Sequence, residues 1–438
     1  MTANSFEVPS SPTLSPSPFY LFMVPAEEEY TTYFISIHRH DMSTPKIAII
    51  GAGPGGLTLA RLLHVNGIPS TIFEKDPDRQ FRHTAGGCLD LRENSGQKAL
   101  HEAGLGDEFE KHARYDGEAL VLTDRFGKEH VDVKDEDTGR PEIDRPVLRA
   151  MLLDSLPDEY IRWGHALKHV DTDGTLHFEH TTERGFDLVV GADGAWSKVR
   201  RVVSTVAPFY SGITGLEWWL KQPDTTHPEL SAAIGNGSYF AFGDEDGHCL
   251  ASQRQGDRSV RTYAFSRVPE SWIKDCGVDW ADRDAAKRAL KDEFRAWPEK
   301  LTRVIDAWEE GEIIPRPLYM LPVGMRWPHQ RGFTLLGDSA HLMTPFAGEG
   351  VNSAMWDALE LAQAIVSDRE DLDRAVWAYE KKMFPRAEKV QQMTWDSTRS
   401  RFDRGGVQTM ANRFNFLMEK RRMGEKVKDN AIGAEVTE

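Results

Sequence analysis

Residues 46–56 read Lys46-Ile-Ala-Ile-Ile-Gly51-Ala-Gly53-Pro-Gly-Gly56. The apolar, β-branched run before the glycines is typical of a buried parallel strand. A helical pattern of leucines follows, and Ser70-Thr-Ile-Phe73 reads as a second short strand that ends at Glu74. The order of strand, G-x-G-x-x-G, helix, strand and acid predicts a complete β-α-β unit of the dinucleotide-binding type.

The glycines of this unit have a physical role. Glycine permits a tight turn and a close approach of the backbone to a pyrophosphate. The helix that follows presents free N–H groups and the positive end of its dipole to the phosphates. An acid after the second strand can accept hydrogen bonds from ribose hydroxyls. We therefore predict that Gly51, Gly53, Gly56 and Glu74 bind a dinucleotide.

Composition excludes several other classes of protein. The 438 residues are 40% hydrophobic and 28% charged, as in ordinary globular proteins. A formal net charge of −16 argues against nucleic-acid binding, which needs basic residues to neutralise phosphates. Three scattered cysteines are too few for a disulfide scaffold and predict a reducing, cytoplasmic compartment. Because no apolar run of about 18 residues occurs, we expect no membrane insertion.

The first 43 residues differ in character from the rest. Residues 8–18 are a serine- and proline-rich stretch that cannot bury much apolar surface, which predicts a disordered extension over residues 1–43. The apolar patch that follows lacks the basic residues that precede the core of a secretory signal. Met42 opens the run into the first strand, so we interpret residues 1–41 as dispensable.

Two later segments show further strands that end in tight turns. Residues 186–200 (FDLVVGADGAWSKVR) pass from an apolar strand through Asp193-Gly into the start of a helix. Residues 332–352 (GFTLLGDSAHLMTPFAGEGVN) pass from another strand through Gly-Asp338 and a Pro/Gly loop into a long helix. With the glycine-rich motif, in this order and spacing, they resemble the class A flavoprotein monooxygenases of the para-hydroxybenzoate hydroxylase fold. The resemblance covers roughly residues 45–425.

The resemblance implies that FAD is the bound dinucleotide. In the family, the first motif binds the ADP part, the Asp-Gly segment serves FAD and NAD(P)H, and the Gly-Asp segment holds the ribityl chain and the flavin ring. No catalytic side chain is assigned, because the flavin mediates the chemistry. Pro345, Gly348 and Gly350 would lie beside the ring. The further residues implied at the cofactor are Lys75, Asp193, Asp338 and Asn352.

Two more runs resemble the tetracycline-inactivating monooxygenases of the TetX type. They are residues 86–105 (GGCLDLRENSGQKALHEAGL) and residues 141–149 (PEIDRPVLR). In those enzymes an Asp and an Arg contact FAD, which implies Asp90 and Arg145 here. A basic residue before the Gly-Gly pair contacts NADPH there, which implies Arg82, with His83 as the alternative. Lys75 adds a second positive charge suited to the phosphate of NADPH.

The loop Gly348-Glu-Gly350 suits the chemistry of a reduced flavin, whose N1–C2=O edge carries negative charge. Free N–H groups at a helix start stabilise such charge. For two acids a simpler role stays open: Asp338 as a helix cap, and Asp193 as the residue that orders its turn. We interpret His341 and Cys88 as packing residues, and we predict no metal site.

Residues 205–325 carry alternating and aromatic stretches, which predict an antiparallel sheet with one face over the flavin. In the family this sheet carries the substrate pocket. By alignment, Glu217, Ser238 and Arg261 replace the Gln, Arg and His that bind tetracycline in TetX-type enzymes. A different aromatic or polycyclic substrate is therefore at least as well supported. The predicted substrate contacts, with plain sheet core as the alternative for the aromatic ones, are Glu217, Trp218, Ser238, Phe240 and Arg261.

These patterns predict an α/β fold: a Rossmann-like FAD-binding domain with a β-sheet substrate domain and a C-terminal bridging helix. Residues 281–311 read as one amphipathic helix and residues 372–402 as the bridging helix. The predicted divisions are 1–43 (extension), 44–204 with 312–372 (FAD-binding domain), 205–311 (substrate-binding domain), 373–425 (C-terminal helix) and 426–438 (flexible tail).

The function implied is a monomeric FAD-dependent monooxygenase. It would use NADPH and O2 to hydroxylate an aromatic or polycyclic small molecule through a flavin C4a-hydroperoxide, with tetracycline-like compounds among the candidates. Two alternatives stay open at this point. One is a flavin-dependent dehydrogenase or halogenase on the same fold, although Glu217-Trp-Trp-Leu220 does not match the halogenase W-x-W-x-I-P segment. The other is a flavin-binding protein without turnover.

Overall fold

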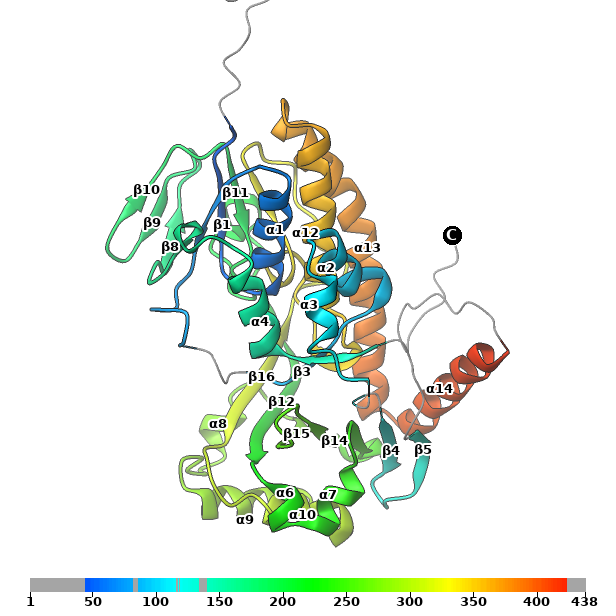
Figure 1. The fold of residues 1–438 in the computed structure, drawn as a ribbon. Helices are drawn as coiled ribbons and strands as arrows, with labels where there is room; N and C mark the ends of the chain where they lie inside the picture. The colour runs from blue at the N-terminus through cyan, green and yellow to red at the C-terminus, as the bar shows by residue number, and fades with distance from the viewer. Residues whose placement is uncertain (1–43, 82–85, 116, 118, 134–139, 424–438) are drawn as a thin grey trace, which may run out of the picture. The chain divides into compact units, whose positions relative to one another are not determined.

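The computed structural model describes residues 44–81, 86–115, 117, 119–133 and 140–423 (Figure 1). Within these residues the fold consists of two large sheets, two small sheets and the helices that pack on them. This is the mixed α/β architecture that the motifs predict. The predictions for residues 1–43, for Arg82 and for His83 lie outside the described residues.

Five parallel strands form the first large sheet, in the order β17-β11-β1-β2-β7. All four residues of β1 are buried, as expected for a strand covered on both faces. Ile47 of β1 lies in register with Ser70 of β2 and Leu188 of β11. The strands span Ile47–Ile50 (β1), Ser70–Phe73 (β2), Ile161–Arg162 (β7), Leu188–Gly191 (β11) and Phe333–Leu335 (β17).

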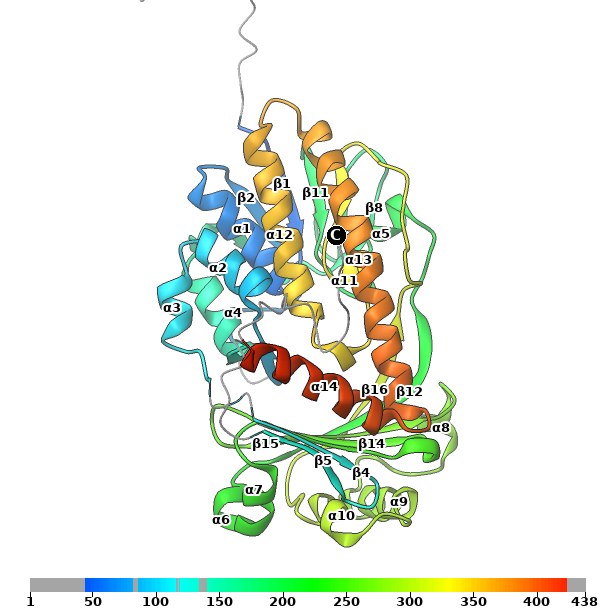
Figure 2. The same cartoon turned by 90° about the vertical axis from the view of Figure 1, so that its right-hand side faces the viewer.

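Helix α1 (Pro54–Val65) begins directly after the glycine-rich loop, with proline at its first position, where a missing N–H costs nothing. It packs against α12 (Gly350–Ser367). Helix α13 (Leu372–Phe402) runs along α12 and reaches the second large sheet, as Figures 1 and 2 show. The other helices around the first sheet are α2 (Lys98–Glu102), α3 (Gly106–Glu110), α4 (Arg145–Asp154), α5 (Arg200–Val203) and α11 (Asp338–His341).

Seven strands form the second large sheet, in the order β16-β12-β15-β14-β13-β4-β5. Neighbouring strands are antiparallel except β13 and β4, which run parallel. The sheet includes strands that lie outside residues 205–311, the range predicted for the substrate-binding domain. Backbone pairing between distant segments adds these strands at the edges of the sheet, and local sequence patterns do not encode such pairing. The strands span Leu120–Asp124 (β4), Glu129–Val133 (β5), Phe209–Leu220 (β12), Ser238–Phe242 (β13), His248–Arg254 (β14), Val260–Arg267 (β15) and Ile314–Met320 (β16).

The two faces of this sheet pack on different helices, because successive side chains of a strand point to opposite faces. On one face Trp218 packs with Trp308 in a core that includes α9 (Arg283–Glu293) and α10 (Glu299–Asp306). On the other face Phe242 and Phe265 share a core with residues of α13 and α14 (Gly406–Arg422). Figure 2 shows α14 lying across this second face.

One helix is predicted over residues 281–311, and the structure has two. Pro298 is the N-cap of α10, since proline cannot continue the preceding helix but fits the start of the next. Asp282 caps α9 by accepting hydrogen bonds from the N–H groups of Asp284 and Ala285. These two short helices cover the outer face of the second sheet (Figure 1).

The remaining elements are short. A hairpin-based sheet contains β8 (Leu167–Val170), β9 (Leu176–Phe178) and β10 (Thr182–Glu183), and β3 (Cys88–Asp90) pairs with β6 (Glu142–Asp144). The short helices beside the second sheet are α6 (Pro223–Thr226), α7 (Pro228–Ile234) and α8 (Trp272–Asp275). Among the described residues, every helix is too short or too polar to cross a bilayer.

Candidate active site

A cavity of about 1010 Å³ lies where the two large sheets meet. Its first part follows the carboxyl ends of the parallel strands, the edge at which ligands bind in such sheets. Gly51 follows β1, Glu74 follows β2, Asp193 follows β11 and Asp338 follows β17, and all four line the cavity. The structure therefore brings together the strand-end residues that the sequence motifs single out.

The glycine-rich loop leaves an open cradle at the start of α1. A Cβ at Gly56 would lie 2.2 Å from the carbonyl oxygen of Gly51, so the loop and helix approach as only glycine allows. Gly51 itself has a φ of +109°. In contrast, no atom lies within 4 Å of a Cβ built on Gly53, which lines the cavity. No side chain caps α1, so its first N–H groups face a space that fits a pyrophosphate.

Glu74 holds this loop against the second strand. Its Oε2 accepts a hydrogen bond from the Ala52 N–H at 2.6 Å, and its Oε1 accepts one from the Asp76 N–H at 3.0 Å. The carboxylate is buried yet lines the cavity, where an acid would meet a ribose. Lys75 beside it is exposed and also lines the cavity.

Arg145, at the start of α4, and Asp338, at the start of α11, both line the cavity although they lie far apart in the sequence. Both side chains stay accessible although protein surrounds them, because the cavity is the space in front of them. Burial raises the pKa of Asp338, and its interactions with His341, Arg145 and Arg200 oppose that rise. Burial also lowers the pKa of Arg145, and Asp338 counters this. Arg145 and Asp338 thus place one positive and one acidic side chain at the cavity wall, where both can bond to the polar chain of a ligand.

Asp193 orders its own turn. Its Oδ2 accepts from the Lys198 N–H at 2.6 Å, and its Oδ1 accepts from the Ser339 hydroxyl at 3.2 Å. The Asp193 carboxylate therefore ties the Asp-Gly turn to the start of α11. Because Asp193 also lines the cavity, the turn-ordering role and contact with a ligand are compatible.

A second uncapped helix start faces the cavity at α12. Gly350 begins the helix, no atom lies within 4 Å of a Cβ built on it, and no side chain caps it. Pro345 and Gly348 lie in the loop before this helix and line the cavity, and Gly348 has a φ of +66° that favours glycine. The free N–H groups and the helix dipole therefore point at a space suited to negative charge.

Asn352 supports this loop from behind and does not line the cavity. Its Nδ2 donates to the Asp90 carbonyl at 2.8 Å, and its Oδ1 accepts from the Arg92 N–H at 2.9 Å. Asp90 lines the cavity, and burial raises the pKa of its carboxyl while Arg92 and Arg140 oppose the rise. Asn352 is therefore a positioning residue, and Asp90 is the member of this group that a ligand can reach.

The predicted substrate contacts divide into two sets. Ser238 and Phe240 of β13 line the cavity, over the half that the second sheet forms. Trp218 is fully buried on the opposite face, where it packs with Trp308. Alternation along β12 explains this placement, because neighbouring residues of a strand point to opposite faces.

Glu217 and Arg261 lie beneath the cavity wall and are bonded to each other. They form a buried ion pair, and the second oxygen of Glu217 accepts from Nε of Arg316 at 2.8 Å. The Arg261 guanidinium also stacks 3.6 Å from the centre of the Trp219 ring. Neither residue lines the cavity. The pair is arranged to hold strands β12, β15 and β16 together, since each partner sits on a neighbouring strand.

Glu217→Ala should therefore lower the free energy of unfolding by about 3 kcal/mol, because it leaves the Arg261 charge buried without its carboxylate. Urea denaturation of the two proteins measures this difference. Lys221→Ala is the matched control: its ion pair with Glu310 is exposed and should contribute under about 1 kcal/mol. Wild-type stability of Glu217→Ala, combined with weakened substrate binding, would instead return Glu217 to the substrate pocket.

Several cavity residues are given no ligand contact by the sequence motifs. Tyr263 lines the cavity, and burial, with the charge of Glu217, raises the pKa of its phenol to about 12, so it keeps its proton at neutral pH. Glu142 and Cys88 lie at another wall, where Arg114 donates to both at 3.3 and 2.8 Å. Burial and nearby acids raise the pKa of the Cys88 thiol, which keeps it protonated. Their positions follow from strand register, which the sequence alone does not reveal.

His341 does not line the cavity. It is buried, and its Nε2 lies 2.6 Å from Asp357 Oδ2. His341 therefore holds the Asp357 carboxylate inside the protein, away from the cavity.

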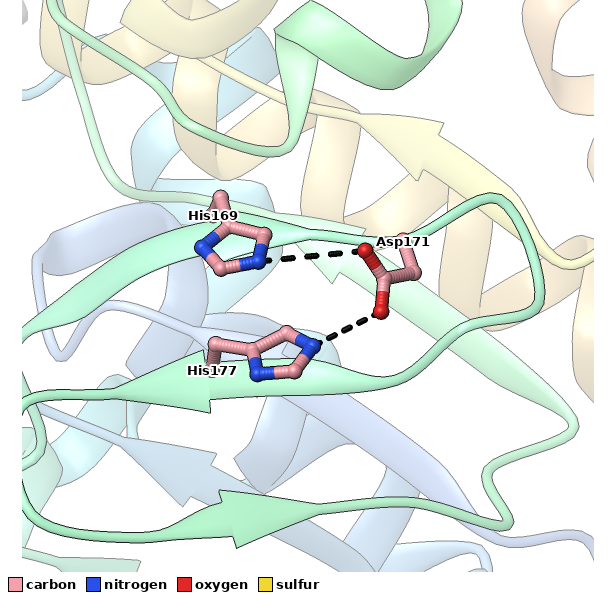
Figure 3. A group of neighbouring side chains, drawn as sticks. All are labelled: His169, Asp171 and His177. Atoms are coloured by element: carbon pink, nitrogen blue, oxygen red, sulfur yellow. Dashed lines mark hydrogen bonds and ion pairs between the residues drawn. The ribbon is translucent and has the colours of Figure 1, made fainter.

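One group of side chains among the described residues offers ligands for a metal ion. His169 of β8 and His177 of β9 lie in direct register, and Asp171 follows in the connecting turn (Figure 3). The imidazole rings stack 4.1 Å apart, and His177 Nε2 lies 2.7 Å from Asp171 Oδ2. The group sits on the surface and does not line the cavity. His177 meets His169 and Asp171 through strand pairing, which the sequence does not reveal, and the absence of a metal site stays a prediction.

Comparison with known proteins agrees with this geometry. Residues 44–264 and 323–394 match the family model described as FAD binding domain. Monooxygenase penA of Penicillium thymicola is 33% identical over 426 residues, covering 84% of this chain and 98% of that protein. Such coverage spans both large sheets, so it extends beyond the dinucleotide cradle.

Two solved structures share the fold. Klebsiella pneumoniae HpxO, complexed with FAD and uric acid, superposes with a TM-score of 0.70 at 21% identity, covering 88% of this chain and 96% of that one. Tetracycline destructase Tet(51) superposes with a TM-score of 0.62 at 18% identity, covering 87% and 96%. The family match agrees with the glycine cradle and with the two uncapped helix starts. The chain belongs to the class A flavin monooxygenases and is an FAD-dependent enzyme.

Proposed function

We propose that this monooxygenase uses NADPH and O2 to oxygenate an aromatic or polycyclic small molecule. The observation that carries the proposal is the continuity of the cavity, which joins the glycine cradle to an aromatic wall of the second sheet. Phe240, Tyr263 and Phe265 contribute to that wall, and Phe414 of α14 faces it. Ligand sites of this kind are mostly apolar with a few placed polar groups.

The chain's own residues have distinct tasks in this proposal. Gly53 and the first N–H groups of α1 bind the pyrophosphate, and Glu74 binds the ribose of FAD. Arg145, Asp338 and the loop from Pro345 to Gly350 hold the ribityl chain and the ring. Bound FAD supplies the electron transfer and the oxygen activation. The N–H groups at the start of α12 stabilise negative charge on the ring edge.

The second sheet and α14 orient the substrate and exclude water. Ser238 and Phe240 contact it, and the protonated Tyr263 hydroxyl donates a hydrogen bond into the cavity. Excluding water strengthens these polar contacts and protects reactive states from hydrolysis. Arg82 and Lys75 are the residues proposed to favour NADPH through its phosphate, and Arg82 lies outside the described residues. A cytoplasmic location and a monomeric state belong to the proposal as well, on the strength of the three free cysteines and the single bridged fold.

The decisive experiment is an absorbance spectrum of the purified protein, followed by NAD(P)H oxidation in air. The panel contains tetracyclines and simple phenols, and each compound is tested with NADPH and with NADH. We expect a yellow protein whose NADPH oxidation accelerates with one class of ligand. Equal rates with NADH and NADPH would remove the preference for the phosphorylated donor. A yellow protein that oxidises NADPH without stimulation by any aromatic compound would contradict the proposed substrate class.

A further inference from the structure

Arg401 is a buried cation that lines the cavity from the last turn of α13. It lies one residue before the end of this helix and is 7% exposed. Here α13 approaches β14, and α14 turns away from it across the second sheet (Figure 2). Nothing in the family motifs places a charge at this position.

The guanidinium of Arg401 is only partly satisfied by the protein. Its Nη1 donates to the Ser397 carbonyl at 3.1 Å and to the Ser397 hydroxyl at 2.6 Å. Within the described residues, Nε and Nη2 have no acceptor and no carboxylate pairs with the charge. The aromatic rings of Phe346 and Phe242 lie 5.1 and 5.6 Å from its central carbon. These rings attract the cation by their faces but accept no hydrogen bond of ordinary strength.

A position near a helix end explains part of this arrangement. A basic side chain in the last turn bonds the final carbonyls and opposes the negative end of the helix dipole. That role accounts for the bond from Nη1 to the Ser397 carbonyl. It leaves the N–H groups of Nε and Nη2 without an acceptor from the described residues, and because the side chain lines the cavity, a ligand there can supply one.

The surroundings show what kind of acceptor fits. The cavity here is lined by apolar side chains, mainly from α14: Phe346, Met410, Phe414, Leu417 and Met418. The acidic residues of the cavity wall, Glu74, Asp90, Glu142, Asp193 and Asp338, belong to the strand ends and to the small β3–β6 sheet. A cation set among apolar and aromatic side chains is complementary to a flat molecule that carries a negatively charged oxygen.

We propose that Arg401 binds an anionic oxygen of the substrate, a carboxylate or an enolate on an aromatic framework, through Nε and Nη2. This inference rests on the proposed function and adds the charge class of the substrate to it. Phe346, which contacts Arg401, follows Pro345 in the loop assigned to the flavin ring. Arg401 therefore anchors the substrate beside that loop and so determines which atom of the framework faces the ring.

The state of the cation supports this role. Burial lowers the pKa of Arg401 to about 10. The side chain therefore stays protonated at neutral pH and offers a permanent positive charge. In an apolar setting a charge-assisted hydrogen bond is stronger than a neutral one, which gives such a residue its selectivity.

The test compares two probes of equal shape, 2-naphthoate and its uncharged amide 2-naphthamide. Isothermal titration calorimetry at pH 7.5 measures the affinity of each for the FAD-loaded full chain. We expect the wild type to prefer naphthoate by at least about tenfold, and Arg401→Gln to lose that preference while binding naphthamide as before. Arg401→Lys keeps the charge and should restore part of the preference.

Arg399→Gln is the matched control, because Arg399 lies on the same helix but is exposed. It should bind both probes as the wild type does. An unchanged preference in Arg401→Gln, or no preference in the wild type, overturns the inference. Equal binding of the two probes by the wild type overturns the inference even if Arg401→Gln does not fold, which circular dichroism shows.

The same preparations separate this inference from the proposed function. FAD content and NADPH oxidation are measured before each titration. A wild type that holds FAD and oxidises NADPH but binds the two probes equally defeats the Arg401 inference alone. A wild type that cannot be loaded with FAD defeats the proposed function, whatever its affinity for naphthoate.

Discussion

Gly53→Asp is expected to give a folded protein that no longer retains FAD. A Cβ at this position meets no atom within 4 Å, so the new side chain fits without disturbing the protein. Its carboxylate would stand in the cradle before α1, where the pyrophosphate of FAD must lie. Two like charges in contact, at a helix start that otherwise favours the phosphate, should weaken FAD binding on the order of a hundredfold.

The measurement is the flavin absorbance of the purified protein, followed by titration with added FAD. Gly53→Asn is the matched control, because asparagine has nearly the same volume without the charge. We expect Gly53→Asn to weaken FAD binding less than Gly53→Asp, with both variants melting like the wild-type apoprotein. Wild-type flavin content in Gly53→Asp would show that the pyrophosphate does not occupy this cradle.

Asp357→Ala is expected to lower the free energy of unfolding by about 5 kcal/mol, at the upper end of the range for broken buried ion pairs. Asp357 is fully buried on α12. Its Oδ1 accepts from Arg386 Nη2 at 2.7 Å, and its Oδ2 accepts from the Gly337 N–H at 2.8 Å and lies 2.6 Å from His341 Nε2. Without this carboxylate all three groups lose their buried partner, and the turn that carries Asp338 loses its anchor.

Urea denaturation at pH 7 measures the effect. Glu360→Ala is the control, since it removes a second, more exposed partner of Arg386 and leaves Asp357 in place. Its cost should be clearly smaller. Equal costs for the two variants would show that Arg386, rather than the whole network around Asp357, carries the stabilisation.

The pH dependence of this network has a definite sign. Burial alone would raise the pKa of Asp357, but His341, Arg386 and the Gly337 N–H together hold it below its usual value. The stabilisation is therefore present above the pKa of the unfolded chain, about 3.9, and is lost as pH falls through the lower pKa of the folded state. The stability deficit of Asp357→Ala should accordingly be full at pH 7 and shrink in strong acid.

Local patterns predicted much of the first sheet. The strand at residues 47–50, the glycine loop, α1 and the strand at residues 70–73 form one continuous segment, in which each element follows directly on the last and β1 pairs with β2. The strand ends after β11 and β17 also carry their own turn signals. Because parallel strands present their carboxyl ends at one edge, residues as distant as Glu74 and Asp338 were expected to line one site, and both line the cavity.

The second sheet shows where such patterns stop. Alternation marks residues 217 and 218 as pointing to opposite faces but does not say which face meets the cavity, so Trp218 and Glu217 were predicted together as substrate contacts. In the structure Trp218 lies in the outer core, and Glu217 is held by Arg261 and Arg316 from two neighbouring strands. Strands β4 and β5 likewise join this sheet from a segment that local patterns assign to the other domain.

What the sequence by itself determined is the cofactor class and the chain segments that approach it, because tight turns and helix starts are local and need particular residues. What only the tertiary structure decided is the character of the rest of the cavity. Tyr263, Glu142 and Arg401 come from segments more than a hundred residues apart, and each is ordinary in its own stretch of sequence. What each of these side chains can do depends on how deeply it is buried and on which partners surround it. Both are set only when distant strands and helices pack together.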